Sequence, residues 1–189
     1  MLHGFKTRAE SLAKEVRGEL QLSQFDPLPP LDLAVLYGIP VIGLAELLAW
    51  GASQESIDHF LGPASDELSA FTITHGTRKL IVQNQNHSST RRSNSICHEM
   101  SHVLLEHEAG PVFGTGGCRR WNDEDEEQAE WLAGVLLVPA EAALQFARRG
   151  ISVAIAARQM GVSPALMTWR LNKSGASTRV LRERRLRKR

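Results

Sequence analysis

The chain has 189 residues, of which 42% are hydrophobic and 23% charged, a composition typical of a folded globular protein and not of a disordered one. No apolar run is long enough to span a bilayer, and residues 1–20 lack the apolar stretch of a signal peptide. The two cysteines, Cys97 and Cys118, could form at most one disulfide, which excludes a disulfide-rich secreted scaffold. We therefore expect a cytoplasmic protein with no membrane partner.

The net charge of +1 is unevenly distributed along the chain. Residues 179–189 contain seven basic residues and one acid, so the preceding 178 residues carry a net charge of −5. Such a cluster can bind an acidic surface or nucleic acid, although termini are more often solvated extensions. We predict one folded domain over residues 1–178, followed by a basic tail at 179–189.

The first half of the chain predicts short helices and one β-hairpin. Helical patterns cover residues 7–22, 31–38 and 44–61, the last interrupted near Gly51. Residues 39–44 are strand-like. Residues 69–75 and 78–84 are rich in β-branched residues and flank Gly76-Thr77, which predicts a hairpin.

The second half predicts a series of longer helices. After a polar loop at 84–94, a helix is expected to begin near Ser93–Ser95 and to stop at Gly110-Pro111. Residues 111–122 form a glycine-rich loop, and the acidic run 123–127 opens a helix that ends at Pro139. Residues 151–173 predict a helix, a turn at Gly161 and a second helix capped by Ser163. The expected fold class is α+β, with a small sheet on the central helix and a helix-turn-helix-like C-terminal cap.

The central helix carries the motif His98-Glu99-Met100-Ser101-His102. Positions i and i+4 lie on one face of a helix, so both imidazoles can bind one metal ion. The glutamate beside the first histidine can take a proton from a metal-bound water that attacks an amide. The alternative is an ordinary helix with two surface histidines. The motif predicts a zinc peptidase site with His98 and His102 as ligands and Glu99 as the catalytic base.

A catalytic zinc site usually has a third protein ligand. His107 lies five residues after His102 and, on a continuous helix, would point away from the metal. A carboxylate from the next helix is the better candidate, and Glu126, Glu127 and Glu130 compete for this role. Helical spacing alone does not choose among them, and most of these acids are expected to be a solvated helix start.

The segment HEMSHVLLEH, followed by EEQAEWLAGVLLVP, resembles the ImmA/IrrE family of gluzincin-like metallo-endopeptidases. Aligning the family pattern E-x-x-A-x-x-F-A-x-x-L-L-x-P implies that Glu126 is the third ligand and that Pro139 closes the helix. The chain departs from the family at Ser101, where glycine is usual, and at Leu132, where an aromatic is usual. Both changes affect packing and neither affects the ligands, so a Zn²⁺ site is still expected.

The donor that stabilises the oxyanion in such a reaction is left open by the sequence. Tyr37, the one tyrosine, lies far off in sequence, and the candidates are His75, His87, His107 and the pair Arg91-Arg92. Cys97 lies about 100° around the helix from the first ligand and is expected to be a small buried residue.

The resemblance implies a regulatory endopeptidase that cleaves an XRE-type helix-turn-helix repressor, as in stress responses and mobile elements. Two alternatives stand beside it: a DNA-associated regulator with a structural or vestigial metal site, and a repressor-binding module. The predicted helical pair and the basic tail favour DNA binding, but its second helix offers few side chains that could contact bases, with Arg170 and Asn172 near its end. An intact Glu99 favours the enzyme, because a structural site needs no base.

Overall fold

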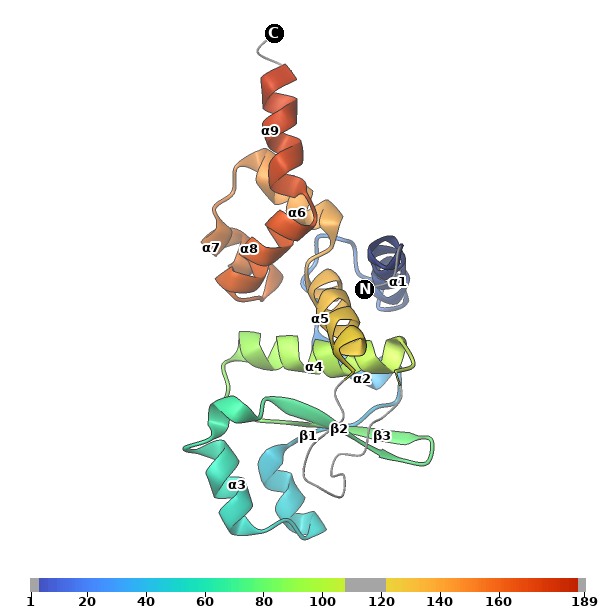
Figure 1. The fold of residues 1–189 in the computed structure, drawn as a ribbon, viewed down its shortest axis with the longest axis vertical. Coiled ribbons are helices and arrows are strands. Elements are labelled where there is room, and N and C mark those ends of the chain that lie inside the picture. The colour runs from blue at the N-terminus through green and yellow to red at the C-terminus, as the bar shows by residue number, and fades with distance from the viewer. Residues whose placement is uncertain (1–3, 108–121, 187–189) are drawn as a thin grey trace. The chain divides into compact units, whose positions relative to one another are not determined.

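The computed structural model describes residues 4–107 and 122–186, and its architecture is α+β (Figure 1). The contacts divide the chain into two compact units. The sheet unit is Pro29–Glu130, and the helical unit combines Met1–Leu28 with Trp131–Arg189. The border between the units falls inside one helix, α5, which spans Asp123–Leu137.

The sheet unit holds the strands and the first of the predicted motif helices. Its elements are α2 (Pro30–Leu36), β1 (Val41–Gly43), the 3-10 helix η1 (Leu44–Trp50), α3 (Gln54–Leu61), the 3-10 helix η2 (Ser65–Glu67), β2 (Ala70–His75), β3 (Arg78–Gln83), α4 (Ser89–Leu104) and the start of α5. The predicted hairpin is confirmed: β2 and β3 pair antiparallel, and Gly76 turns between them with a φ of 60°. β1 pairs parallel to β3, so the strand order is β1-β3-β2.

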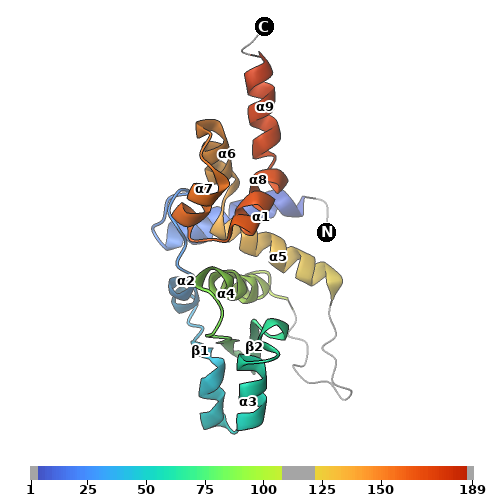
Figure 2. The ribbon, with the colours of Figure 1, turned by 90° about the vertical axis from the view of Figure 1, so that its left-hand side faces the viewer.

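The sheet is covered on both faces. Side chains alternate between the two faces along each strand, so neighbouring residues of a strand contact different covering elements. Leu80 and Val82 of β3 are buried with Leu44 of η1 and Ile57 of α3. The helix α4 contacts β2 and β3. Figures 1 and 2 show α4 and α3 on opposite faces of the sheet. Residues of β2 and β3 that point away from the η1–α3 cluster therefore face α4.

The central helix is longer at its start than the polar sequence before the motif suggested. The expectation that it begins near Ser93–Ser95 is wrong, because Ser88 caps it and accepts a hydrogen bond from the backbone N–H of Arg91 at 3.3 Å. The Arg91 side chain pairs with Asp66 and donates to the Ser69 hydroxyl at 2.9 Å. This pairing holds the pKa of Asp66 below its usual value. Tertiary contacts of the first turn therefore keep a polar segment helical.

The same helix ends earlier than expected. It stops at Leu104, with Leu105 as the C-cap, whereas a stop at Gly110-Pro111 was predicted. Gly110, Pro111, Cys118 and the predicted glycine-rich loop lie outside the described residues, apart from Asn122.

The helical unit is built from α1 (Phe5–Glu19), the end of α5, α6 (Ala140–Arg149), α7 (Val153–Met160), α8 (Pro164–Lys173) and α9 (Ala176–Leu186). The predicted pair α7–α8 is confirmed, with Gly161 in the left-handed region at a φ of 67° and Ser163 capping α8. Residues 179–186 of the predicted tail are helical, as part of α9, which packs against α6 (Figure 2). In the parts of the chain that are described, no single helix meets the length and hydropathy needed to cross a membrane, although α5 and α6, bent by 54°, do so as a pair.

Two buried arginines bind the C-terminal carbonyls of α5. Arg17 donates to the carbonyl of Leu136 at 2.6 Å, and Arg170 donates to the carbonyl of Val138 at 2.7 Å. Burial lowers the pKa of Arg170, and the carboxylate of Glu10, 2.7 Å away, opposes this shift. Both cations lie at the negative end of the helix dipole, where they satisfy carbonyls that have no helical partner.

A glycine of α5 allows an aromatic side chain of α8 to pack directly against the helix. A Cβ atom at Gly134 would lie 2.5 Å from Cζ3 of Trp169, which also meets Trp131 edge to face at 5.3 Å. The indole is rigid, and 2.5 Å is shorter than any ordinary separation between two non-bonded carbon atoms. Glycine at position 134 is therefore required by packing, in a helix interior that would otherwise favour alanine.

We predict that Gly134→Ala lowers the free energy of unfolding by about 1–3 kcal/mol, the usual cost of overpacking. The matched control is Gly18→Ala in α1, where an added Cβ meets nothing within 4 Å and helix propensity favours alanine by up to about 1 kcal/mol. Thermal unfolding followed by circular dichroism compares the two variants. Equal stability of the two would contradict the close contact with Trp169.

Candidate metal centre

The two histidines of the motif lie one turn apart on α4. Their Nε2 atoms are 3.1 Å apart, and the ring centroids are separated by 4.8 Å. The side chain of His98 is 26% exposed and that of His102 is 14% exposed. Both rings therefore reach solvent enough to admit an ion or substrate, while α4 holds them in one orientation.

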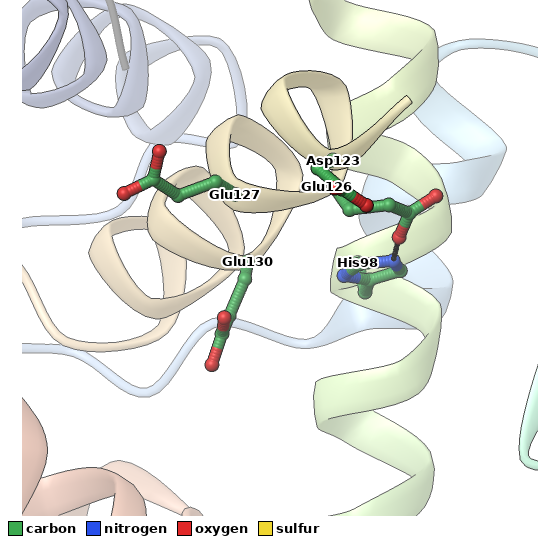
Figure 3. Close-up of a pocket in the computed structure, with 5 residues that line it drawn as sticks. All are labelled: His98, Asp123, Glu126, Glu127 and Glu130. Carbon is green, nitrogen blue, oxygen red and sulfur yellow. Dashed lines mark hydrogen bonds and ion pairs between the residues drawn. The ribbon is translucent and has the colours of Figure 1, made fainter. Parts of the chain in front are cut away.

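The third group comes from the first turn of α5. Oε2 of Glu126 lies 3.1 Å from Nε2 of His98, and Oε1 lies 3.5 Å from Nε2 of His102. Figure 3 shows the carboxylate of Glu126 directed at the His98 ring. Among the described residues, these three form a group that could hold a metal ion, because their donor atoms all lie within 4.8 Å of one another.

This donor set fits a zinc ion. Ligand atoms about 2.0–2.1 Å from zinc, arranged as a tetrahedron, lie about 3.3 Å from one another. The separations of 3.1, 3.1 and 3.5 Å between the three donor pairs agree with that value. Two imidazoles and one carboxylate also match the ligand types of catalytic zinc sites, which leave a fourth position open for water or substrate.

The choice among the three competing acids follows from their phase on α5. Figure 3 shows the carboxylates of Glu127 and Glu130 directed away from His98, whereas Glu126 faces it. Consecutive helical residues are rotated by about 100°, so one position of the acidic run meets α4 while its neighbour cannot. The geometry thus brings together the residues that the family pattern implied as ligands.

Glu99 lies on the side of α4 that faces the sheet. Its side chain is almost fully buried, and its Oε2 accepts a hydrogen bond of 2.6 Å from the hydroxyl of Thr72 in β2. Thr72 pairs with Ile81 of β3, on the sheet face opposite the η1–α3 cluster. The sheet therefore supplies the polar partner that a buried carboxylate requires.

An acidic pocket of about 470 Å³ adjoins His98 (Figure 3). It is lined by His98, Asp123, Glu126, Glu127 and Glu130. Acids in the first turn of α5 are favoured by the helix dipole, so part of this charge stabilises the helix itself. The remaining effect is a negative potential beside the three donor atoms.

Most of the other residues considered from the sequence lie elsewhere in the sheet unit. His87 contacts the carbonyl of Ser65 at 2.8 Å, and Arg91 binds the segment at 66–69. Tyr37 is the C-cap of α2, and His75 is the last residue of β2. These positions leave the oxyanion donor unassigned.

Two residues next to the ligands behave as small packing groups. Cys97 and Ser101 are both fully buried, and the hydroxyl of Ser101 donates to the carbonyl of Cys97 at 2.7 Å. This bond satisfies the polar group that replaces the family's usual glycine. Leu132, which replaces the usual aromatic, is also fully buried.

The comparison with protein families agrees with this geometry. A peptidase family described as the IrrE N-terminal-like domain matches residues 52–172, more than half of the chain. The chain belongs to this family. The expected membership of the ImmA/IrrE peptidases is thereby confirmed, and the matched span includes His98, Glu99, His102 and Glu126. A comparison with curated proteins finds no match.

We predict that zinc raises the melting temperature of the wild-type protein, because an ion that binds only the folded state stabilises it by about 2.7 kcal/mol at 100 times its dissociation constant. Glu126→Gln should weaken zinc binding by more than the roughly 10–100-fold that loss of an outer-shell partner costs.

Glu127→Gln and Glu130→Gln are matched controls, since they remove the same charge from the same helix. We expect both to bind zinc within a few-fold of the wild type in a competition titration with a chromophoric chelator. A loss in Glu127→Gln or Glu130→Gln equal to that in Glu126→Gln would rule out Glu126 as the specific ligand.

Proposed function

We propose that this chain is a zinc-dependent regulatory endopeptidase that cleaves a helix-turn-helix repressor. The observation that carries the proposal is the group of three donor atoms from His98, His102 and Glu126, together with the buried carboxylate of Glu99 on the same helix α4. A structural metal site is usually closed by four protein ligands, and here three converge within the described residues. Membership of a peptidase family supports the same reaction.

A zinc ion held by these three residues would supply Lewis-acid polarisation of the scissile carbonyl. Glu99 acts as the general base: its carboxylate takes a proton from the attacking water and later returns it to the leaving amine. Thr72 orients this carboxylate through the hydrogen bond to Oε2. Because Oε2 is held in place, the position of Oε1 is fixed as well. Burial of Glu99 excludes bulk water from the group that transfers the proton.

Two features support a basic, extended peptide as the substrate. The pocket beside His98 is lined by four carboxylates, which favour a cationic segment, and DNA-binding repressors are rich in basic residues. Within the described residues β2 is at the edge of the sheet, and its Thr72 contacts Glu99. An extended peptide paired with that edge would run next to the proposed base.

The proposed role is to relieve repression, under stress or in a mobile element, in the cytoplasm where repressor and DNA meet. Such an enzyme cuts one protein at one place. We therefore expect little activity on generic peptides, because binding energy from the whole repressor orders the scissile bond.

We predict that zinc-loaded wild-type protein cleaves the helix-turn-helix repressor encoded nearest to its own gene. Glu99→Gln should slow this cleavage by about 10²–10⁴-fold, because the general base is lost, while zinc affinity stays within a few-fold of the wild type. Electrophoresis and mass spectrometry of the products measure the rate and the cleavage site. Glu55→Gln, an exposed change in α3, is the control and should leave the rate unchanged. Cleavage that persists in Glu99→Gln would overturn the mechanism.

A second function, nucleic-acid binding, is favoured by one observation. The helix α9 exposes Arg179, Arg182, Arg184 and Arg185. Against it, Arg170 of α8 is fully buried and bonded to Glu10, so it is not available to contact bases. Any binding through α9 would therefore be to phosphates and independent of sequence.

We predict that the wild type binds duplex DNA weakly, with no preference for sequence and with strong salt dependence. Removing residues 179–189 should abolish this binding without changing zinc affinity, as seen in a gel shift and a chelator titration. Sequence-specific binding that survives the truncation would favour the DNA-associated regulator over the peptidase.

A further inference from the structure

The end of α4 folds back on itself in a defined turn. The backbone N–H of His107 donates to the carbonyl of His102 at 3.0 Å, and the N–H of Glu106 donates to the carbonyl of Val103 at 3.1 Å. Glu106 has a φ of 55°, in the left-handed region. These are the two hydrogen bonds and the left-handed residue of a Schellman motif, which places the side chain after the turn against the helix residue five positions earlier. Here those two residues are His107 and His102.

The histidine after the turn is therefore directed at a candidate ligand, and the expectation that it points away on a continuous helix does not apply. Nδ1 of His107 lies 3.0 Å from Nδ1 of His102, and the two rings meet edge to face with centroids 5.1 Å apart. The His107 side chain is only 8% exposed. A buried imidazole needs polar partners, and His102 is one of them.

The positions of the protons follow from the proposed ligand set. A neutral histidine that binds a metal through Nε2 carries its proton on Nδ1. His102 then donates from Nδ1 to Nδ1 of His107, and the proton of His107 must be on its Nε2. That nitrogen lies 3.7 Å from Oδ1 of Asp125, long for a hydrogen bond but close enough for electrostatic attraction.

Asp125 is placed by its position on α5 and by a side-chain hydrogen bond. It precedes Glu126 in the first turn of α5, and its Oδ2 accepts a hydrogen bond of 2.8 Å from the side chain of Asn122. The chain of contacts runs from His102 through His107 to Asp125, so it joins the end of α4 to the start of α5 next to the third ligand.

We propose that His107, supported by Asp125, is the positioning residue that fixes the tautomer and ring orientation of His102 for metal binding. Ligand histidines almost always donate their second N–H to an outer partner, and loss of that partner typically costs 10–100-fold in metal affinity. In this site the partner is a second histidine supplied by the turn. This inference rests on the proposed metal site.

The test compares two classes of substitution at position 107 in the full chain. His107→Phe keeps an aromatic ring but has no acceptor for the Nδ1–H of His102, and it should weaken zinc binding by 10–100-fold. His107→Asn places an amide oxygen near the position of Nδ1, and it should restore affinity to within a few-fold of the wild type. Where the phenyl ring prevents folding, His107→Leu removes the same acceptor with a smaller side chain.

The readouts are zinc affinity, by competition with a chromophoric chelator, and the histidine nitrogen resonances of the zinc-loaded protein. We expect the wild type and His107→Asn to show His102 protonated at Nδ1 in a hydrogen bond, and His107→Phe to lose that signature. Glu106→Gly is the control: it suits the left-handed position, keeps the turn, and should leave the affinity within about twofold.

Unchanged affinity in both His107→Phe and His107→Leu would overturn the inference, as would equal weakening in Phe and Asn variants, which would indicate only a packing role. Failure of the wild type to bind zinc at all is a different result. It would overturn the proposed metal site and with it the peptidase.

Discussion

The candidate site depends on one carboxylate from α5 that reaches two imidazoles on α4. The donor atoms of His98, His102 and Glu126 crowd to separations of 3.1–3.5 Å. A divalent cation at their centre would bind all three donor atoms at once and so stabilise the arrangement. The rest of the sheet unit can be understood as the framework that holds these two helices at that distance.

The framework assigns each face of α4 a separate task. One face presents the two imidazoles, and another buries Glu99 against Thr72 of the sheet. A buried carboxylate without a donor would cost several kcal/mol, so the hydroxyl from β2 makes the position tolerable. At the start of the helix, Arg91 and Ser88 hold the first turn, and at its end the turn at Glu106 returns His107 to the ligands. Polar contacts therefore hold α4 at its first turn, at Glu99 and at its last turn.

The helical unit uses charge in another way. Arg17 and Arg170 are buried at the C-terminal end of α5, where they satisfy carbonyl groups and not a substrate. This explains why the basic residue of α8 that a DNA-binding hypothesis would use is unavailable. Four exposed arginines lie on α9. The close contact of Gly134 with Trp169 adds a steric constraint, because the indole lies too close to the backbone of α5 for a Cβ atom at position 134.

Periodic patterns in the sequence predicted much of the fold, and the misses have identifiable causes. The hairpin, the helical pair with its turn at Gly161 and the helix to Pro139 follow from local propensity, so they were predictable. The predictions for both ends of α4 were wrong. Its first turn is polar and stays helical because Arg91 binds residues 66–69. Its end is followed by Glu106 in the left-handed region, at a position where a glycine would have indicated the end of the helix. The helices α6 and α9 were not anticipated, the latter because a run of arginines resembles a solvated tail.

The sequence by itself determined which residues could form the metal group, because a helix repeats every 3.6 residues and places His98 and His102 on one face whatever surrounds them. It also determined the family, through a pattern of residues that extends well beyond the motif. Helical spacing left three acids of α5 in competition, and the family pattern implied Glu126. The tertiary structure adds the physical reason, because the rotation of one helix against another determines which acid meets those histidines. Only the tertiary structure brought Thr72 to Glu99 and His107 to His102. The first contact depends on the packing of α4 on the sheet. The second depends on a turn that the local sequence does not predict.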